Sequence, residues 1–150
     1  MREELEQRFV KAFPNLYADV GGNEQETCMH YGIGVGDGWF DLLWECSAKI
    51  EAEILRMPVA ERHNFKAAQV KEKFGGLRFY MTSHGNPAID DAISEAERKS
   101  YRTCEHCGLP GEERDGGWVK VLCDSCHEKN EQNRAQRRAA EQLLYKPKEQ

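Results

Sequence analysis

Apolar residues at helical spacing begin the chain. Leu5, Phe9 and Phe13 follow one another at intervals of four residues, which places them on one stripe of a helix over residues 1–13. Pro14 cannot continue that helix because it lacks a backbone N–H and clashes with the preceding turn. The pattern therefore predicts an amphipathic N-terminal helix that buries one aromatic stripe.

The strongest helical pattern covers residues 39–57, and Pro58 ends it. Asp37 stands just before this helix, where a carboxylate can accept a hydrogen bond from a free backbone N–H. A further, weaker pattern predicts a helix over residues 87–101. The apolar stripe of the main helix runs through Phe40, Leu43, Trp44, Ser47, Ile50, Ile54 and Met57.

Two other stretches have the composition of strands. Residues 28–36 are rich in glycine and are expected to form a bent strand followed by a loop. Residues 68–82 predict a hairpin with a tight turn at Gly75 and Gly76, because glycine accepts the positive φ angles that such a turn needs. Alternate positions on its two arms are Val70, Glu72 and Phe74, then Leu77, Phe79 and Met81. The helices and the hairpin together predict an α+β fold in which a small antiparallel sheet packs on the 39–57 helix.

Four of the six cysteines stand in two pairs with the spacing of metal ligands. Two residues separate Cys104 from Cys107 and Cys123 from Cys126, and fifteen residues lie between the pairs. Four thiolates complete the tetrahedron that Zn²⁺ prefers and leave no coordination position for water. The spacing predicts one structural zinc ion per chain. A histidine next to a ligand, His106 or His127, is a weaker alternative as a ligand.

The residues around the cysteines also fit a zinc finger. Gly108 permits a tight turn after the first pair, and residues 112–123 predict a hairpin with Asp115-Gly116 at its bend. A helix is expected to follow to about residue 144. This order of turn, hairpin and helix resembles the treble-clef zinc finger. The resemblance extends to HNH nucleases, but the hairpin sequence GWVKVL lacks the general-base histidine that their chemistry needs.

Composition and charge limit the domain organisation and the cellular location that the chain can have. The 150 residues, with 39% hydrophobic and 31% charged residues, predict a globular body over residues 1–100 and a four-cysteine finger with a protruding helix over 101–150. No apolar run approaches the ~20 residues of a membrane span, and the charged N-terminus is unlike a signal peptide. The expected location is therefore the cytoplasm, where thiols stay reduced. A net charge of −5 argues against a general DNA-binding protein.

Three surfaces are candidates for partner binding. On the 68–82 hairpin, Arg78 and Tyr80 share a face with Lys71 and Lys73, although such alternation also suits a purely structural hairpin. On the last helix, three arginines at i, i+3 and i+4 can meet phosphate or simply face solvent, and three apolar residues can dock on a partner, on a second copy or back onto the body. These residues are Arg134, Arg137 and Arg138, then Leu143, Leu144 and Tyr145.

The sequence gives little support for a catalytic site built on a cysteine. Cys28 and Cys46 lack partners at ligand spacing, and a nucleophilic thiol would need a nearby base such as His30 or His63. Cys46 lies in an apolar helix, where cysteine behaves as a small hydrophobic residue. The sequence predicts a binding protein and not an enzyme.

Three segments together resemble a family of small, mostly uncharacterised zinc-finger proteins of tailed bacteriophages and prophages. The segments read GDGWFDLLWE, QVKEKFGGLRFYM and TCEHCGLPGEER–GW–LCDSC, and the resemblance spans about residues 30–127. It implies a phage-type product with a zinc finger that acts in the bacterial cytoplasm, and it supplies no established activity. By analogy with other small acidic phage proteins, we expect the chain to bind a bacterial protein, either as an inhibitor of host defence such as an anti-CRISPR-type protein or as an adaptor that redirects a host protein. The alternative is a nucleic-acid-binding finger that uses the three arginines and Lys120. A homodimer through the last helix is also compatible with the sequence.

Overall fold

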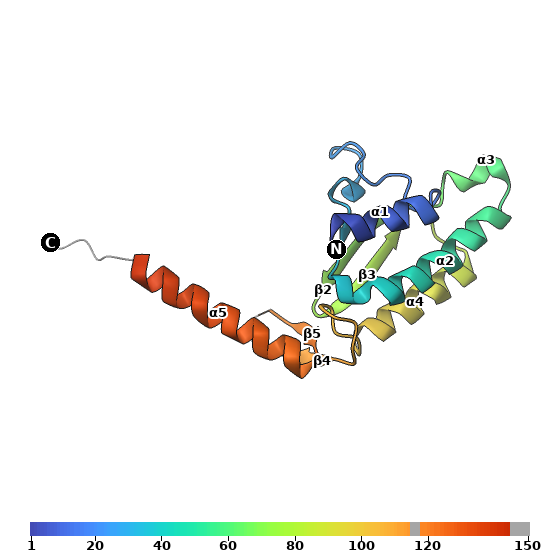
Figure 1. The fold of residues 1–150 in the computed structure, drawn as a ribbon. Coiled ribbons are helices and arrows are strands. Elements are labelled where there is room, and N and C mark those ends of the chain that lie inside the picture. Colours follow the sequence, from blue (N-terminus) through green and yellow to red (C-terminus); the bar gives the residue numbers. More distant parts are fainter. Residues whose placement is uncertain (115–117, 145–150) are drawn as a thin grey trace.

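The structure, a computed structural model, describes residues 1–114 and 118–144, without the side chains of 143 and 144. An α+β body carries a small sheet, and a four-cysteine segment follows it and leads into a long C-terminal helix (Figure 1). The fold class predicted from the sequence is confirmed. The helices are α1 (Glu3–Ala12), α2 (Phe40–Arg56), α3 (Val59–Arg62), α4 (Pro87–Ser100) and α5 (Asp124–Leu144), with short 3-10 helices η1 (Cys28–Tyr31) and η2 (Asp37–Trp39). The strands are β1 (Ile33–Gly34), β2 (Ala67–Lys73), β3 (Gly76–Met81), β4 (Glu112–Arg114) and β5 (Lys120–Leu122).

The main sheet has the order β1-β2-β3, with β2 and β3 antiparallel as the hairpin pattern predicts. The short strand β1 pairs in parallel with β2. The prediction of one bent strand over residues 28–36 was wrong for its first half, which forms η1. The Thr27 hydroxyl accepts a hydrogen bond from the Met29 N–H at 3.1 Å and starts this helical turn, which buries Met29 in the core.

One face of the sheet is covered by α1, α2 and α4 (Figure 1). The predicted apolar stripe of α2 lies in this core, where Leu43, Ile50 and Ile54 are fully buried. Ser47, the polar member of the stripe, is hydrogen-bonded to the Tyr17 hydroxyl at 2.8 Å, so its burial leaves no unsatisfied oxygen. Most of the hydrophobic burial therefore lies between the helical layer and one side of the sheet.

The open edge of β3 is closed by side chains of α4. The Leu77 N–H donates to Ser100 Oγ at 2.8 Å, and the Phe79 N–H donates to Glu97 Oε1 at 3.3 Å. An edge strand otherwise offers unpaired N–H groups to other strands. Because these two donors are satisfied within the chain, this edge is unsuited to strand addition by a partner.

The hairpin turns one residue earlier than the glycine pair predicts. Lys73 pairs with Gly76, so the two loop residues are Phe74 and Gly75, with φ angles of 53° and 77°. The register is fixed by the buried pair Val70 and Phe79, and Gly76 is needed as the first residue of β3. Phe74 consequently lies in the turn and not on the buried face of the strand, and it is 68% exposed.

Asp37 does not cap the main helix. Its carboxylate accepts a hydrogen bond from the Arg2 N–H at 2.8 Å and forms an ion pair with the Arg2 guanidinium. These contacts, the backbone N–H first, lower the pKa of Asp37. The aspartate therefore fastens the N-terminus to η2, and η2 itself provides the first turn before α2.

The helix α5 projects away from the body (Figure 1). Its residues between Cys126 and Gln142 are exposed or at most half-buried, as the scarcity of apolar residues in this stretch predicts. None of the helices in the described ranges combines the length and apolar character needed to cross a membrane.

Candidate metal centre

The first cysteine pair lies on a tight turn that follows α4. The Gly108 N–H donates to the Cys104 carbonyl at 2.9 Å, and the Cys104 N–H donates to the Leu109 carbonyl at 2.8 Å. Gly108 has a φ of +79°, a conformation that side chains disfavour. The turn thus directs Cys104 and Cys107 toward the same point, with Cys104 fully buried and Cys107 exposed.

The second pair lies where β5 joins α5. Cys123 follows the last residue of β5, and Cys126 lies in the first turn of α5. The hairpin of β4 and β5 pairs Glu113 with Val121, and Val121 is fully buried. The predicted order of turn, hairpin and helix is therefore present, while the predicted bend at Asp115-Gly116 lies outside the described residues.

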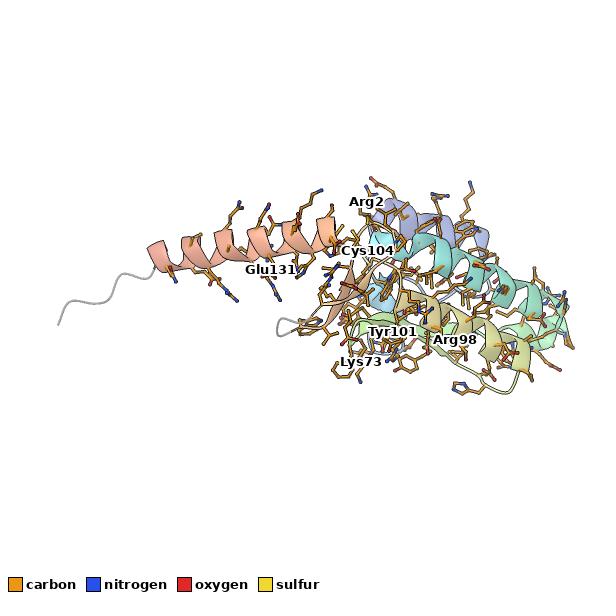
Figure 2. All side chains as sticks on the ribbon, turned by 90° about the horizontal axis from the view of Figure 1, so that it is seen from below. Arg2, Lys73, Arg98, Tyr101, Cys104 and Glu131 are labelled. Carbon is orange, nitrogen blue, oxygen red and sulfur yellow. The ribbon has the colours of Figure 1, made fainter. Side chains whose placement is uncertain are left out.

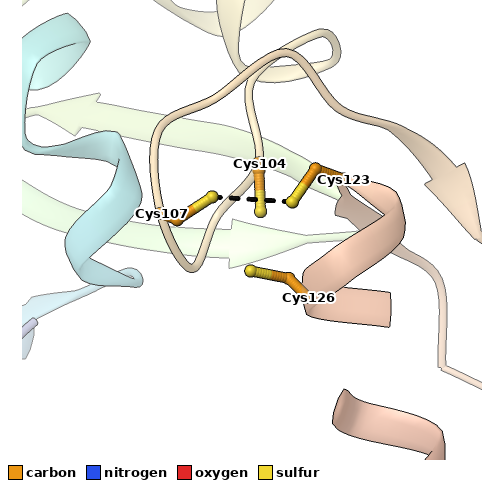
Figure 3. A group of neighbouring side chains, drawn as sticks. All are labelled: Cys104, Cys107, Cys123 and Cys126. Atoms are coloured by element: carbon orange, nitrogen blue, oxygen red, sulfur yellow. Dashed lines mark hydrogen bonds between the residues drawn. The ribbon is translucent and has the colours of Figure 1, made fainter. Parts of the chain in front are cut away.

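The four sulfur atoms converge on one point (Figure 3). They all lie within 4.8 Å of one another, and the Sγ atoms of Cys107 and Cys123 are 3.6 Å apart. A tetrahedron with Zn–S bonds of about 2.3 Å has sulfur–sulfur edges of about 3.8 Å. The cluster therefore has the dimensions of a tetrahedral four-sulfur site, and its sulfurs are too far apart for disulfides.

The electrostatics of the cluster also favour a bound cation. Burial opposes ionisation of Cys104, but the neighbouring backbone N–H groups of Cys123, Cys107 and His106 favour the thiolate and bring its pKa down to about 7. Burial and the neighbouring thiols raise the pKa of Cys126 to about 12. Cys126 thus stays a neutral thiol near neutral pH unless a cation compensates the charge of its thiolate, as a metal ion does.

The turn that carries Cys104 and Cys107 packs directly on η2, the short helix that precedes α2. The Gly38 N–H donates to the Glu105 carbonyl at 2.8 Å, and the Trp39 indole N–H donates to the Thr103 carbonyl at 2.8 Å. A Cβ atom on Gly38 would lie 2.3 Å from the Cys104 carbonyl oxygen. This short helix therefore needs glycine here because the two backbones are in contact.

Glu105 joins the same two parts of the chain. It is only 6% exposed, and its carboxylate accepts the Gly36 N–H at 3.1 Å and pairs with Lys120 Nζ at 3.1 Å. Sequence reasoning missed this residue because nothing local distinguishes a buried glutamate from a surface one. Lys120, a candidate for phosphate contact, is thus already paired with a carboxylate.

The predicted partner-binding residues lie in two places. Arg78 and Tyr80 are on the face of the sheet away from the helices, where Arg78 pairs across the strands with Lys71. Arg78 also donates to the Tyr101 hydroxyl at 2.9 Å. Figure 2 shows Lys73 and Tyr101 on the side of the molecule opposite Arg2.

On α5, Arg134 forms an ion pair with Glu131 at 3.1 Å, while Arg137 and Arg138 are exposed. The apolar tip, Leu143, Leu144 and Tyr145, falls outside the described side chains.

The two remaining cysteines differ in accessibility. Cys46 is 3% exposed, and burial raises the pKa of its thiol to about 12, so it is not a ready nucleophile. Cys28 is exposed in η1, and within the described ranges no hydrogen bond joins it to His30 or to any other histidine. Among the described residues, neither cysteine is hydrogen-bonded to a histidine that could act as its base.

In the metal-loaded protein, Cys28 is expected to be the one thiol that reacts rapidly with a disulfide reagent such as DTNB. Metal ligation protects the four clustered thiolates, and burial protects Cys46. A chelator should expose the four, and denaturant should then expose Cys46. Absorbance at neutral pH measures each step. Rapid reaction that persists in metal-loaded Cys28→Ser protein would contradict this assignment.

The chain matches no protein-family model, no curated protein and no solved structure at a significant level. The structure by itself defines the class of protein. It is an α+β protein with a four-cysteine cluster that could hold a metal ion.

Proposed function

We propose that this chain is a non-enzymatic zinc protein that acts by binding a bacterial protein. The observation that carries the proposal is the four-cysteine cluster, in which an ion would have four sulfur ligands and no open coordination position. A closed site of this kind holds a fold together, whereas a catalytic zinc keeps one position for water or substrate. The ligands would be Cys104, Cys107, Cys123 and Cys126.

Zinc is favoured among metals by the ligand chemistry. Four thiolates in a tetrahedron suit zinc or an iron–sulfur centre. A turn, a hairpin and a helix that carries the last cysteine resemble the treble-clef arrangement, which supports zinc. The metal would compensate the charge of the four thiolates and hold the turn, β5 and α5 together.

The partner class is supported by charge and by exposed surface. The chain carries a net charge of −5, which opposes long-range attraction to nucleic acid. Exposed side chains on the open face of the sheet and along α5 offer contact surfaces away from the buried core. By the resemblance to phage proteins, we further propose that the partner belongs to a bacterial defence system and that the chain acts in the bacterial cytoplasm.

A nucleic-acid ligand is the second candidate. It is favoured by Arg137 and Arg138, which are exposed and have no ion pair among the described residues. Arg134 and Lys120 are less available because each is paired with a glutamate. Of the four cations that the sequence assigned to this candidate, two therefore have no ion pair among the described residues.

Affinity capture from bacterial lysate tests the proposal. The tagged, zinc-loaded chain is expected to retain a stoichiometric protein that survives nuclease treatment. Charge reversal of Arg137 and Arg138 should leave that capture intact. Loss of the captured material with nuclease would move the function to nucleic acid. Sedimentation of the purified chain separately measures self-association through α5.

A further inference from the structure

Phe74 occupies a position that its side chain disfavours. Among the described residues other than glycine it is the one with a positive φ, at 53°, in a turn where glycine or asparagine is preferred. Its ring is 68% exposed, so it contributes little to the core. A large aromatic side chain held in the left-handed region and exposed to solvent indicates a role outside the fold.

A second exposed aromatic side chain comes from the finger. Trp118 is 67% exposed, and its indole N–H donates to Glu72 Oε2 at 3.3 Å. The other oxygen of the same carboxylate accepts the Gly75 N–H at 2.7 Å. Glu72 therefore holds both the turn that carries Phe74 and the indole of Trp118.

The two rings belong to one groove. An open cavity of about 490 Å³ is lined by Glu72, Lys73, Phe74, Trp118 and Val119. The finger packs closely on the turn here, because a Cβ atom on Gly75 would lie 3.2 Å from Val119 Cγ1. A groove of this size and mainly apolar lining accepts a side chain of a ligand.

Lys73 lines the groove, and Lys71 and Arg78 share its face of the sheet, so this face is basic in an otherwise acidic chain. The hairpin over residues 67–81 has three basic residues against one acidic residue, although the whole chain has a net charge of −5. Lys71 and Arg78 form one cross-strand pair, and Lys73 pairs with Gly76 two positions closer to the turn. No carboxylate of the described residues makes an ion pair with any of these three cations. Their charge is available to an anionic partner.

We infer that the groove between Phe74 and Trp118 docks an acidic protein segment. The segment inserts an apolar side chain between the two rings and places its carboxylates beside Lys71, Lys73 and Arg78. An apolar anchor in a pocket with a charged rim is the usual arrangement of a protein–protein hot spot. The inference rests on the proposed function and names the surface and the chemistry of the partner.

Protein is favoured over single-stranded nucleic acid as the occupant. Exposed aromatic and basic side chains suit both ligands. However, the groove contains the Glu72 carboxylate, and the acidic chain as a whole repels a polyanion more strongly than a short acidic segment. The groove also requires the finger, since Trp118 and Val119 form one wall. The metal centre thereby contributes to binding by holding that wall against the body.

Selection from a displayed library of random peptides tests the inference. Zinc-loaded protein is expected to enrich peptides that combine several acidic residues with an apolar residue. One enriched peptide, labelled with a fluorophore, should bind Phe74→Gly and Trp118→Ala protein at least about tenfold more weakly by anisotropy. Lys73→Glu should also weaken it. Tyr31→Ala, which removes another aromatic side chain that is 77% exposed, is the matched control and should bind normally.

Phe74→Gly separates binding from folding. Glycine adopts the left-handed conformation without steric conflict, so this variant is expected to melt no lower than the parent. A protein with unchanged stability that has lost the peptide would support the groove. Equal binding by the parent and Phe74→Gly, or no enrichment of acidic peptides, would overturn the inference.

Other occupants give different results. Oligothymidylate binding that Phe74→Gly abolishes would assign the groove to nucleic acid, and self-association that Phe74→Gly abolishes would assign it to a second copy. Either result overturns the inference. In the lysate experiment, capture that persists with Phe74→Gly overturns the groove but leaves the proposed function intact. Absence of any captured protein overturns the proposed function instead.

Discussion

Replacing Cys104 with serine is expected to remove the bound metal and to unfold the segment from Thr103 to the first turn of α5. The segment has little other support, because β4 and β5 have three residues each and its buried apolar side chains are few. Zinc binding supplies about 10–16 kcal/mol to small zinc fingers at neutral pH. Cys104 is the one fully buried cysteine of the four, so its loss should be severe.

Metal analysis and thermal unfolding measure this effect. The parent should contain one zinc per chain, and Cys104→Ser should contain much less and unfold at a lower temperature. Chelation of the parent should reproduce the variant. Cys28→Ser changes an exposed cysteine outside the cluster and should keep both the zinc and the stability. Full zinc content in Cys104→Ser would show that the cluster is not the metal site.

Trp39→Ala is expected to lower the free energy of unfolding by about 3–5 kcal/mol. The side chain is fully buried, and its indole N–H donates to the Thr103 carbonyl at 2.8 Å, one residue before the first metal ligand. The substitution therefore removes both core volume and a hydrogen bond that fastens the finger to the body. Zinc should also be lost to a chelator more rapidly, since the metal-binding turn loses its support.

Urea unfolding with a matched tryptophan control tests this expectation. Trp118→Ala makes the same chemical change at an exposed position and should alter the free energy of unfolding by about 0.5 kcal/mol or less. Trp39→Phe should fall between the two, because it keeps most of the volume but leaves the Thr103 carbonyl without its donor. Equal stability of the two alanine variants would contradict the role assigned to Trp39.

Gly38→Ala examines the same contact without removing a core side chain. The added Cβ would meet the Cys104 carbonyl oxygen at 2.3 Å and the Cys107 nitrogen at 2.5 Å, so the metal-binding turn must shift. Gly21→Ala is the control, because Gly21 has open space around it and only its φ of +72° opposes a side chain. We expect Gly38→Ala to accelerate zinc loss and Gly21→Ala to leave it unchanged.

The cysteine spacing alone predicted the four-cysteine cluster that could hold a metal ion. Two residues between the members of each pair suffice to direct two sulfurs from one tight turn, so the local sequence fixes each half of the site. The helices α1, α2 and α4 were likewise predictable, because their apolar residues recur with the period of a helix and prolines mark the ends of α1 and α2 and the start of α4. These features depend on neighbours within a few positions.

The register of the hairpin was beyond local reasoning. Phe74-Gly75 and Gly75-Gly76 are both two-residue sequences with glycine, and glycine content favoured the second. The choice was made by the burial of Val70 opposite Phe79, a pairing that the whole core selects. A shift of one residue exposed Phe74 and so created one wall of the groove.

The contacts between the body and the finger were decided by tertiary structure alone. Trp39 and Thr103 are 64 residues apart, and Glu72 and Trp118 are 46 residues apart. Neither contact can be recognised from the local sequence. A residue that bonds a distant part of the chain has no feature in its own segment that distinguishes it from other residues of its type. The sequence by itself therefore determined which residues can bind the metal. The packing of the two segments determined that the metal centre is fastened to the core and that the two parts share a groove.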